Sequence, residues 1–127
     1  MNQQPGPVIV DIAGTSLTPE DRERLAHPLV GGVILFSRNF ESADQVARLT
    51  ADMRSARDGA LLVCVDHEGG RVQRFRDGFS AIEPMRALGQ RWDVDPVDAC
   101  REATSIGATI GRELKAVGVD LSFTPVL

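Results

Sequence analysis

Cysteine and aromatic residues are scarce in this chain of 127 residues, which contains two cysteines, one tryptophan and no tyrosine. Cys64 lies inside an apolar run and Cys100 inside a predicted helix. Their spacing matches neither a zinc site nor a disulfide framework. We therefore expect two reduced thiols, as is usual in the cytoplasm.

Long apolar segments and basic clusters are also missing. No uncharged apolar stretch reaches the roughly 18 residues that a membrane-spanning helix requires, and the N-terminus lacks the pattern of a secretion signal. The net charge is −4, and no stripe of lysine or arginine is present that would favour nucleic acid or an anionic membrane. These absences predict a cytoplasmic protein whose partner is a small molecule or another protein.

Several motifs for cofactors and metals are absent as well. The chain has neither the G-x-x-x-x-G-K-[ST] string of a phosphate-binding loop nor the G-x-G-x-x-G string of a dinucleotide site. His67 and Glu68 begin like the zinc motif H-E-x-x-H, but position 71 is arginine. No Ser-His-Asp or Cys-His arrangement can be assigned.

What the chain does contain is an alternation of apolar runs with amphipathic helical patterns. Because the apolar runs are continuous, they predict strands that are buried on both faces. Alternation of such strands with helices predicts an α/β fold with a parallel sheet. The predicted strands are Val8–Ile12, Gly32–Phe36, Leu61–Val65 and, more weakly, Val119–Phe123. The predicted helices are 19–27 capped by Thr18, 43–57 capped by Ser42, and 96–117 capped by Asp95.

Two parts of the chain fit this alternation poorly. The segment from Glu68 to Asp95 shows neither pattern, and we predict a long functional or flexible loop there. The chain stops directly after the fourth predicted strand, with no helix to follow it. A parallel sheet needs both faces covered, so we expect residues 1–127 to be one incomplete unit at the beginning of a larger protein.

Charged residues crowd the end of the third predicted strand. In parallel α/β folds the ligand site lies beyond the carboxyl ends of the strands, and Asp66 occupies that position. Its carboxylate is suited to accept hydrogen bonds from a polyol, and Arg74 is suited to orient Asp66 or to bind the ligand. The alternative is that Asp66 only caps the following turn or pairs with Arg71.

Other polar or aromatic residues allow two interpretations each. The cluster 37–39 (Ser-Arg-Asn) follows the second predicted strand, either on the same rim or as simple turn chemistry. Trp92 is suited to stack on a sugar, but a lone tryptophan is more often a packing anchor. We assign His27 to the end of the first helix and give it no catalytic role.

Four motifs in order resemble one known family. They are V-G-G-V-I-L-F-S-R-N-F (30–40), V-D-H-E-G-G-R-V-Q-R-F (65–75), P-M-R-A-L-G (84–89) and G-V-D-L-S-F-T-P-V-L (118–127). Together they are similar to the N-terminal part of the bacterial β-N-acetylglucosaminidases of glycoside hydrolase family 3. The resemblance covers nearly the whole chain.

This resemblance implies a (β/α)8 TIM barrel, of which the chain supplies about the first three βα units and a fourth strand. It implies an enzyme of peptidoglycan recycling that removes terminal N-acetylglucosamine from muropeptides with retention of configuration, without metal or cofactor. Position by position, Asp66 and Arg74 match the family's sugar-binding aspartate and arginine. The strand would then end in charge because it holds a saccharide.

The family's catalytic groups have no counterpart among these residues. Its nucleophilic aspartate and its acid/base histidine lie in later motifs, so we assign no catalytic residue here and predict that the 127-residue chain does not hydrolyse glycosides, with the remainder of the barrel as its partner. Two alternatives stay open. They are a non-catalytic carbohydrate-binding or assembly module, and a family 3 exo-β-glucosidase.

Overall fold

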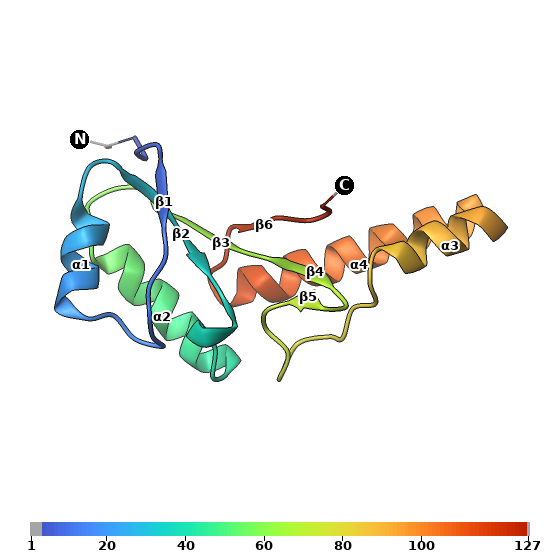
Figure 1. Ribbon diagram of the computed structural model, residues 1–127, viewed down its shortest axis with the longest axis horizontal. Helices are drawn as coiled ribbons and strands as arrows, with labels where there is room; N and C mark the ends of the chain where they lie inside the picture. The colour runs from blue at the N-terminus through green and yellow to red at the C-terminus, as the bar shows by residue number, and fades with distance from the viewer. Residues whose placement is uncertain (1–3, 127) are drawn as a thin grey trace.

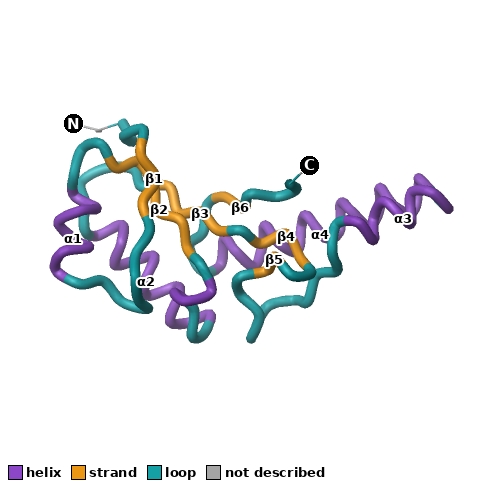
Figure 2. The backbone as a smooth tube through the Cα atoms, viewed as in Figure 1, coloured by secondary structure: helices purple, strands orange, loops and turns teal. Residues whose placement is uncertain are grey.

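The computed structural model describes residues 4–126, and its centre is a sheet of four parallel strands (Figures 1 and 2). The strand order β1-β2-β3-β6 follows the chain, so each strand lies beside its predecessor in this sheet. All three pairings are parallel, which confirms the predicted α/β arrangement. The strands are β1 (Val8–Val10), β2 (Val30–Leu35), β3 (Leu62–Val65) and β6 (Leu121–Ser122).

The helices that connect these strands begin at the predicted caps. Thr18 caps α1 (Pro19–Ala26), with the Thr18 hydroxyl accepting from the Asp21 amide and the Asp21 carboxylate accepting from the Thr18 amide. Such a reciprocal box satisfies two amides that the first helical turn leaves free. Ser42 caps α2 (Ala43–Ser55), and Asp95 caps α4 (Pro96–Ala116).

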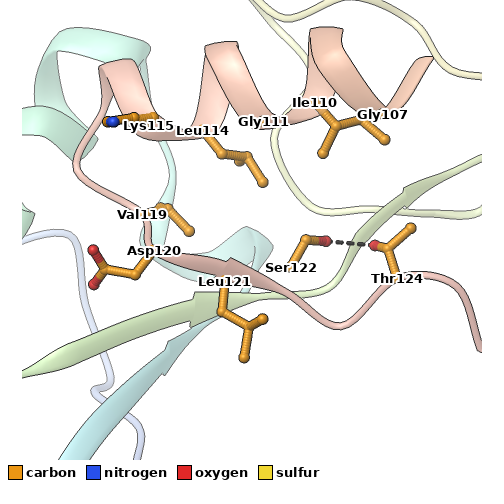
Figure 3. Close-up of a pocket in the computed structure, with 10 residues that line it drawn as sticks. All are labelled: Gly107, Ile110, Gly111, Leu114, Lys115, Val119, Asp120, Leu121, Ser122 and Thr124. Carbon is orange, nitrogen blue, oxygen red and sulfur yellow. Dashed lines mark hydrogen bonds between the residues drawn. The ribbon is translucent and has the colours of Figure 1, made fainter. Parts of the chain in front are cut away.

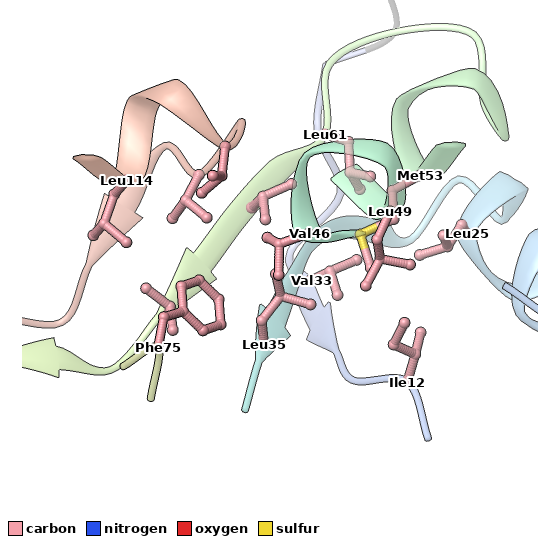
Figure 4. Packing of buried hydrophobic residues seen from close by; sticks show 14 of the residues in the cluster. Ile12, Leu25, Val33, Leu35, Val46, Leu49, Met53, Leu61, Phe75 and Leu114 are labelled. Atoms are coloured by element: carbon pink, nitrogen blue, oxygen red, sulfur yellow. The ribbon is translucent and has the colours of Figure 1, made fainter. Parts of the chain in front are cut away.

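The hydrophobic core lies between the helices and one face of the sheet (Figure 4). Every second strand residue points to this face, because side chains alternate along a strand. Val33 and Val63 are fully buried there, and they pack in the same cluster as Leu49 and Met53 of α2 and Leu114 of α4. The apolar stripes predicted for the two helices are therefore their core-facing sides.

The segment from Glu68 to Asp95 was predicted as a loop, and this was wrong. It holds most of an antiparallel hairpin, β4 (His67–Gly69) with β5 (Val72–Gln73), and a helix, α3 (Arg86–Val94). The hairpin strands are too short to show a pattern, and α3 begins without a side-chain cap. Figure 1 shows α3 lying against α4. This tertiary contact stabilises α3, for which the sequence carries only a weak helical signal.

Smaller differences concern the outer strands. The first strand ends at Val10 rather than Ile12, and the fourth is reduced to Leu121 and Ser122. Both are edge strands, which have a neighbour on one side only and so keep fewer ladder hydrogen bonds. In residues 4–126, no helix combines the length and the apolarity needed to cross a membrane.

Candidate functional site

The candidate site lies at the carboxyl ends of the parallel strands, and Asp66 is its centre. Asp66 directly follows β3, so the strand fixes where its backbone leaves the sheet. Its side chain is partly exposed and accepts a hydrogen bond from Arg74, with 3.3 Å between Arg74 Nη2 and Asp66 Oδ2. The predicted alternative pairing with Arg71 is wrong, because the partner is Arg74.

Arg74 reaches Asp66 because the hairpin folds back over the end of β3. The Arg74 amide donates to the Asp66 carbonyl at 3.3 Å, which extends the pairing of β4 with β5 by one step. Arg74 Nε is buried and has no hydrogen-bond partner among the described residues. The Nε side of the Arg74 guanidinium is therefore buried. Its Nη2 contacts Asp66 at the rim, where both side chains are partly exposed.

Gly69 and Gly70 make the sharp turn of this hairpin. Both have positive φ angles, +106° and +57°, which glycine adopts without the strain a side chain would bring. A Cβ at Gly69 would lie 2.4 Å from the Glu83 carbonyl oxygen, and one at Gly70 would lie 2.7 Å from Pro84 Cγ. The double glycine thus lets the turn approach the chain's own 82–84 segment closely.

Two members of the rim, Asp11 and Phe36, were not predicted from the sequence. Asp11 follows β1 and forms an ion pair with Arg38, whose Nε also donates to the Ile12 carbonyl. Arg38 lies over the Phe36 ring, with 4.6 Å from Cζ to the ring centroid, and Arg74 Cζ lies 5.9 Å from the same centroid. The only sequence signal for a rim position of Asp11 and Phe36 is that each directly follows a parallel strand.

Asn39, from the predicted polar cluster, is structural. It is fully buried, its Oδ1 accepts from the Phe36 amide at 2.8 Å, and its Nδ2 donates to the carbonyls of Ile12 and Gly14. The turn interpretation therefore holds for Asn39, while Arg38 lies on the rim. By joining the ends of β1 and β2, Asn39 fixes the position of Phe36.

His67 is enclosed by aromatic rings and takes no part in the rim. It is fully buried, with ring centroids 5.9 Å from Phe75 and 5.6 Å from Phe79, and neither imidazole nitrogen has a hydrogen-bond partner among the described residues. Burial lowers the pKa of His67, Glu113 acts in the opposite direction, and Arg76 lowers it further. The imidazole is therefore neutral near pH 7.

The end of β6 is tied to the same hairpin through its hydroxyl groups. Ser122 and Thr124 both donate to the His67 carbonyl, at 3.1 and 3.2 Å, and Ser122 Oγ accepts from the His67 amide. Glu68 accepts from the Val126 amide at 3.1 Å. Four parallel strands thus present their carboxyl ends on one rim around Asp66.

Two further residues from the sequence analysis lie away from this rim. His27 ends α1, where its Nδ1 accepts from the Leu29 amide, so the predicted helix-end role is confirmed. Trp92 belongs to α3 and lines a shallow cavity with residues of α4, but it is 54% exposed, so it is not the buried packing anchor that the sequence favoured. Among residues 4–126, no group of three or more histidine, cysteine, aspartate or glutamate side chains is placed to hold a metal ion.

A cavity beside the sheet meets the rim only at Ser122 and Thr124. It has a volume of about 500 Å³ and lies between α4 and β6 (Figure 3). Its lining is mainly apolar or glycine, with Lys115 and Asp120 at one end and Ser122 and Thr124 at the other. Asp120 in this lining is already paired with Arg54, and Asp66 and Arg74 are not among the lining residues.

Comparison with known proteins gives close relatives over the whole chain. The chain is 60% identical over 124 residues to a protein named Beta-hexosaminidase from Bordetella avium, and 58% identical over 127 residues to a Beta-hexosaminidase from Chromobacterium violaceum. These alignments cover 97% and 100% of this chain but 35% and 36% of the relatives. The chain thus spans about a third of the length of the curated relatives it matches.

Solved structures agree with this kinship. NagZ from Neisseria gonorrhoeae, crystallised in complex with zinc ion, is 48% identical with a TM-score of 0.96, covering 99% of this chain and 38% of its own. The same protein in complex with N-trifluoroacetyl-D-glucosamine is 47% identical with a TM-score of 0.94, covering 98% and 36%. The predicted fold, part of a TIM barrel, is confirmed, and the barrel is not closed within this chain.

The family itself follows from a match along nearly the whole sequence. The sequence profile described as the Glycosyl hydrolase family 3 N terminal domain matches residues 8–127. That range includes every strand of the parallel sheet and the whole rim from Asp11 to Thr124. The chain therefore belongs to glycosyl hydrolase family 3.

Proposed function

We propose that this chain is the N-terminal portion of the catalytic barrel of an exo-β-N-acetylglucosaminidase, and that Asp66 and Arg74 bind the terminal sugar. The observation that carries the proposal is the ion pair itself, held at the carboxyl end of a central parallel strand in a member of this hydrolase family. A relative's complex with an N-acylated glucosamine supports a saccharide as ligand.

The chemistry of the pair suits a sugar. A carboxylate can accept hydrogen bonds from two neighbouring hydroxyls, and each such bond to a charged group contributes about 1.5–3 kcal/mol. Arg74 carries donors that remain free after it binds one carboxylate oxygen, so it can hold a third ligand oxygen. Because Arg74 also restrains the Asp66 side chain, less conformational entropy of that side chain is lost when the ligand binds.

The bond-breaking groups are proposed to come from the rest of the protein. A retaining glycosidase uses one nucleophilic group and one proton-transferring group on either side of the scissile bond. His67 is unsuitable as the second, because it is fully buried and away from the rim. We therefore propose that the 127-residue chain alone does not hydrolyse glycosides.

The biological setting is proposed to be cytoplasmic peptidoglycan recycling, with muropeptides that end in N-acetylglucosamine as substrates. The relatives' name, Beta-hexosaminidase, supports the amino-sugar specificity. Measuring the whole protein on an N-acetylglucosaminide and on the matching glucoside tests this directly. A higher kcat/KM on the glucoside would overturn the assignment in favour of an exo-β-glucosidase.

The role of Asp66 is tested in the whole protein by Asp66→Ala. Loss of two charged hydrogen bonds predicts a fall of kcat/KM by at least about a hundredfold, because these bonds strengthen as the sugar ring flattens in the transition state. Asp58→Ala is the matched control, since Asp58 lies in the turn before β3, at the opposite end of the strand. A change below about threefold for Asp66→Ala would show that the carboxylate does not bind the sugar.

A further inference from the structure

The Arg74 side chain makes fewer hydrogen bonds than its burial calls for. Its Nε is buried and has no hydrogen-bond partner among residues 4–126. Its Nη2 donates to Asp66 over 3.3 Å, whereas charged hydrogen bonds of this kind are usually about 2.7–2.9 Å long. A buried guanidinium nitrogen without a partner costs free energy. The bond to Asp66 therefore does not by itself account for the position of Arg74.

The ring of Phe36 lies next to this guanidinium. Leu35 of β2 pairs with Val65 of β3. The residues that follow these two, Phe36 and Asp66, therefore stand at the ends of adjacent strands. Arg74 Cζ lies over the Phe36 ring, 5.9 Å from its centroid. A cation within about 6 Å of the face of an aromatic ring is attracted by the negative potential of that face. Arg74 is thus held by a carboxylate that follows β3 and by a ring that follows β2.

The backbone conformation of Phe36 directs its side chain away from the core. Phe36 has extended φ and ψ angles, −126° and 176°, so the alternation of side chains along β2 continues through it. Leu35 is fully buried on the helix side, and Phe36 therefore lies on the opposite face of the sheet. Within residues 4–126, the hydrophobic core and the side chains packed against it do not include Phe36. The ring therefore contributes to the rim and not to the core.

The ring is held in place before any ligand binds. Arg38 Cζ lies 4.6 Å from the centroid of the Phe36 ring. Arg38 is in turn restrained by its ion pair with Asp11 and by the hydrogen bond from its Nε to the Ile12 carbonyl. The Phe36 amide donates to Asn39 Oδ1 at 2.8 Å, which fixes the backbone. The ring is thus a fixed surface for the second guanidinium that packs against it.

Each of the two cations beside the ring has a carboxylate of its own. Asp11 pairs with Arg38, and Asp66 pairs with Arg74. The aromatic face adds an attraction for each guanidinium that an aliphatic side chain lacks. Leucine at position 36 would keep most of the apolar volume and remove this attraction, so the effect of the ring can be separated from that of packing.

We propose that Phe36 is a positioning residue for the terminal sugar. Its ring holds the Arg74 guanidinium in the orientation that restrains Asp66 and leaves other donors free for the ligand. Phe36 acts through Arg74 and does not bind the sugar itself. This inference rests on the proposed function, because it requires that Arg74 binds the sugar.

A double-mutant cycle in the whole protein tests this role. The variants are Phe36→Leu, Arg74→Met and the two combined. The measurements are kcat/KM on an N-acetylglucosaminide and the inhibition constant of N-acetylglucosamine. Phe36→Leu should lower kcat/KM and weaken inhibition by about three- to tenfold, the range expected when a partly desolvated cation loses its ring. In the Arg74→Met background, the same substitution should change either quantity by less than about twofold.

Two further variants separate positioning from a loss of stability. Phe36→Tyr keeps the ring and should stay within about twofold of the natural protein. Phe79→Leu is the matched control, because it removes another half-buried ring, one that packs against Phe40 and Phe75. Its effect should be the same with and without Arg74→Met. Urea unfolding identifies any variant that does not fold, and Phe36→Met replaces Phe36→Leu in that case.

Three results would overturn the proposal. An equal effect of Phe36→Leu in both backgrounds would mean that the ring acts independently of Arg74. The other two are the absence of any effect of Phe36→Leu, and a failure of Phe36→Tyr to retain kcat/KM.

The cycle also separates this inference from the proposed function. If Arg74→Met itself changed kcat/KM by less than about threefold, Arg74 would not bind the sugar, and the proposed site and the positioning role would both be wrong. A large loss from Arg74→Met without coupling to Phe36 would refute the positioning role alone.

Discussion

The buried imidazole of His67 predicts an acid-sensitive fold. Its side chain is enclosed by Phe75 and Phe79, and neither nitrogen has a partner among the described residues. Burial lowers the pKa of His67 in the folded chain, against 6.5 for an unperturbed histidine. Lowering the pH therefore protonates the unfolded chain first, and the unfolded state is stabilised relative to the folded one.

The size of the effect follows from proton linkage. Well above pH 6.5 both states are neutral at His67, and the free energy of unfolding keeps its full value with respect to this group. Below pH 6.5 the unfolded chain binds one more proton than the folded chain, so the free energy of unfolding falls by up to about 1.4 kcal/mol per pH unit. The fall stops once the pH passes below the lowered pKa of the folded state.

Urea unfolding between about pH 5.5 and 7.5 measures this slope. His67→Gln removes the titrating group while keeping a polar side chain of similar size, and the difference in slope between the two proteins cancels the contribution of the carboxylates. His27→Gln is the matched control, since His27 is the chain's other histidine and is exposed at the end of α1. Equal slopes for the natural chain and His67→Gln would refute the reasoning.

Two further predictions concern local backbone chemistry. Gly69→Ala should lower the free energy of unfolding more than Gly78→Ala, because both residues have positive φ angles but only the Cβ at Gly69 would collide with the Glu83 carbonyl. Urea unfolding measures both variants, and equal decreases in the free energy of unfolding would show that the hairpin backbone shifts to accommodate a Cβ at Gly69. Thr18→Ala should cost about 1 kcal/mol through loss of the cap on α1, while Thr18→Ser should cost little. If Thr18→Ser lowered the free energy of unfolding as much as Thr18→Ala, the capping hydroxyl would be excluded as the cause.

The parallel sheet and the helices α1, α2 and α4 were predictable because their signals are local. An apolar run such as Leu61–Val65 has no other stable location than a buried strand, and caps such as Asp95 satisfy amides within one helical turn. The position of Asp66 was predictable on the same logic, since a parallel strand places the next residue of the chain on the rim. Arg74 was favoured as a site residue, but the sequence left a pairing of Asp66 with Arg71 open as the alternative.

The tertiary structure decided which residues share the rim and which are buried. Arg74 was selected over Arg71 by the hairpin, whose turn depends on the packing of Gly69 against Glu83, a contact across fourteen residues. Asp11 and Phe36 joined the rim only when strands distant in sequence became neighbours. The sequence alone determined the capped helices, whose hydrogen bonds close within a turn, and the apolar runs that become buried strands. Three-dimensional packing determined every contact whose free energy depends on residues far apart in the chain.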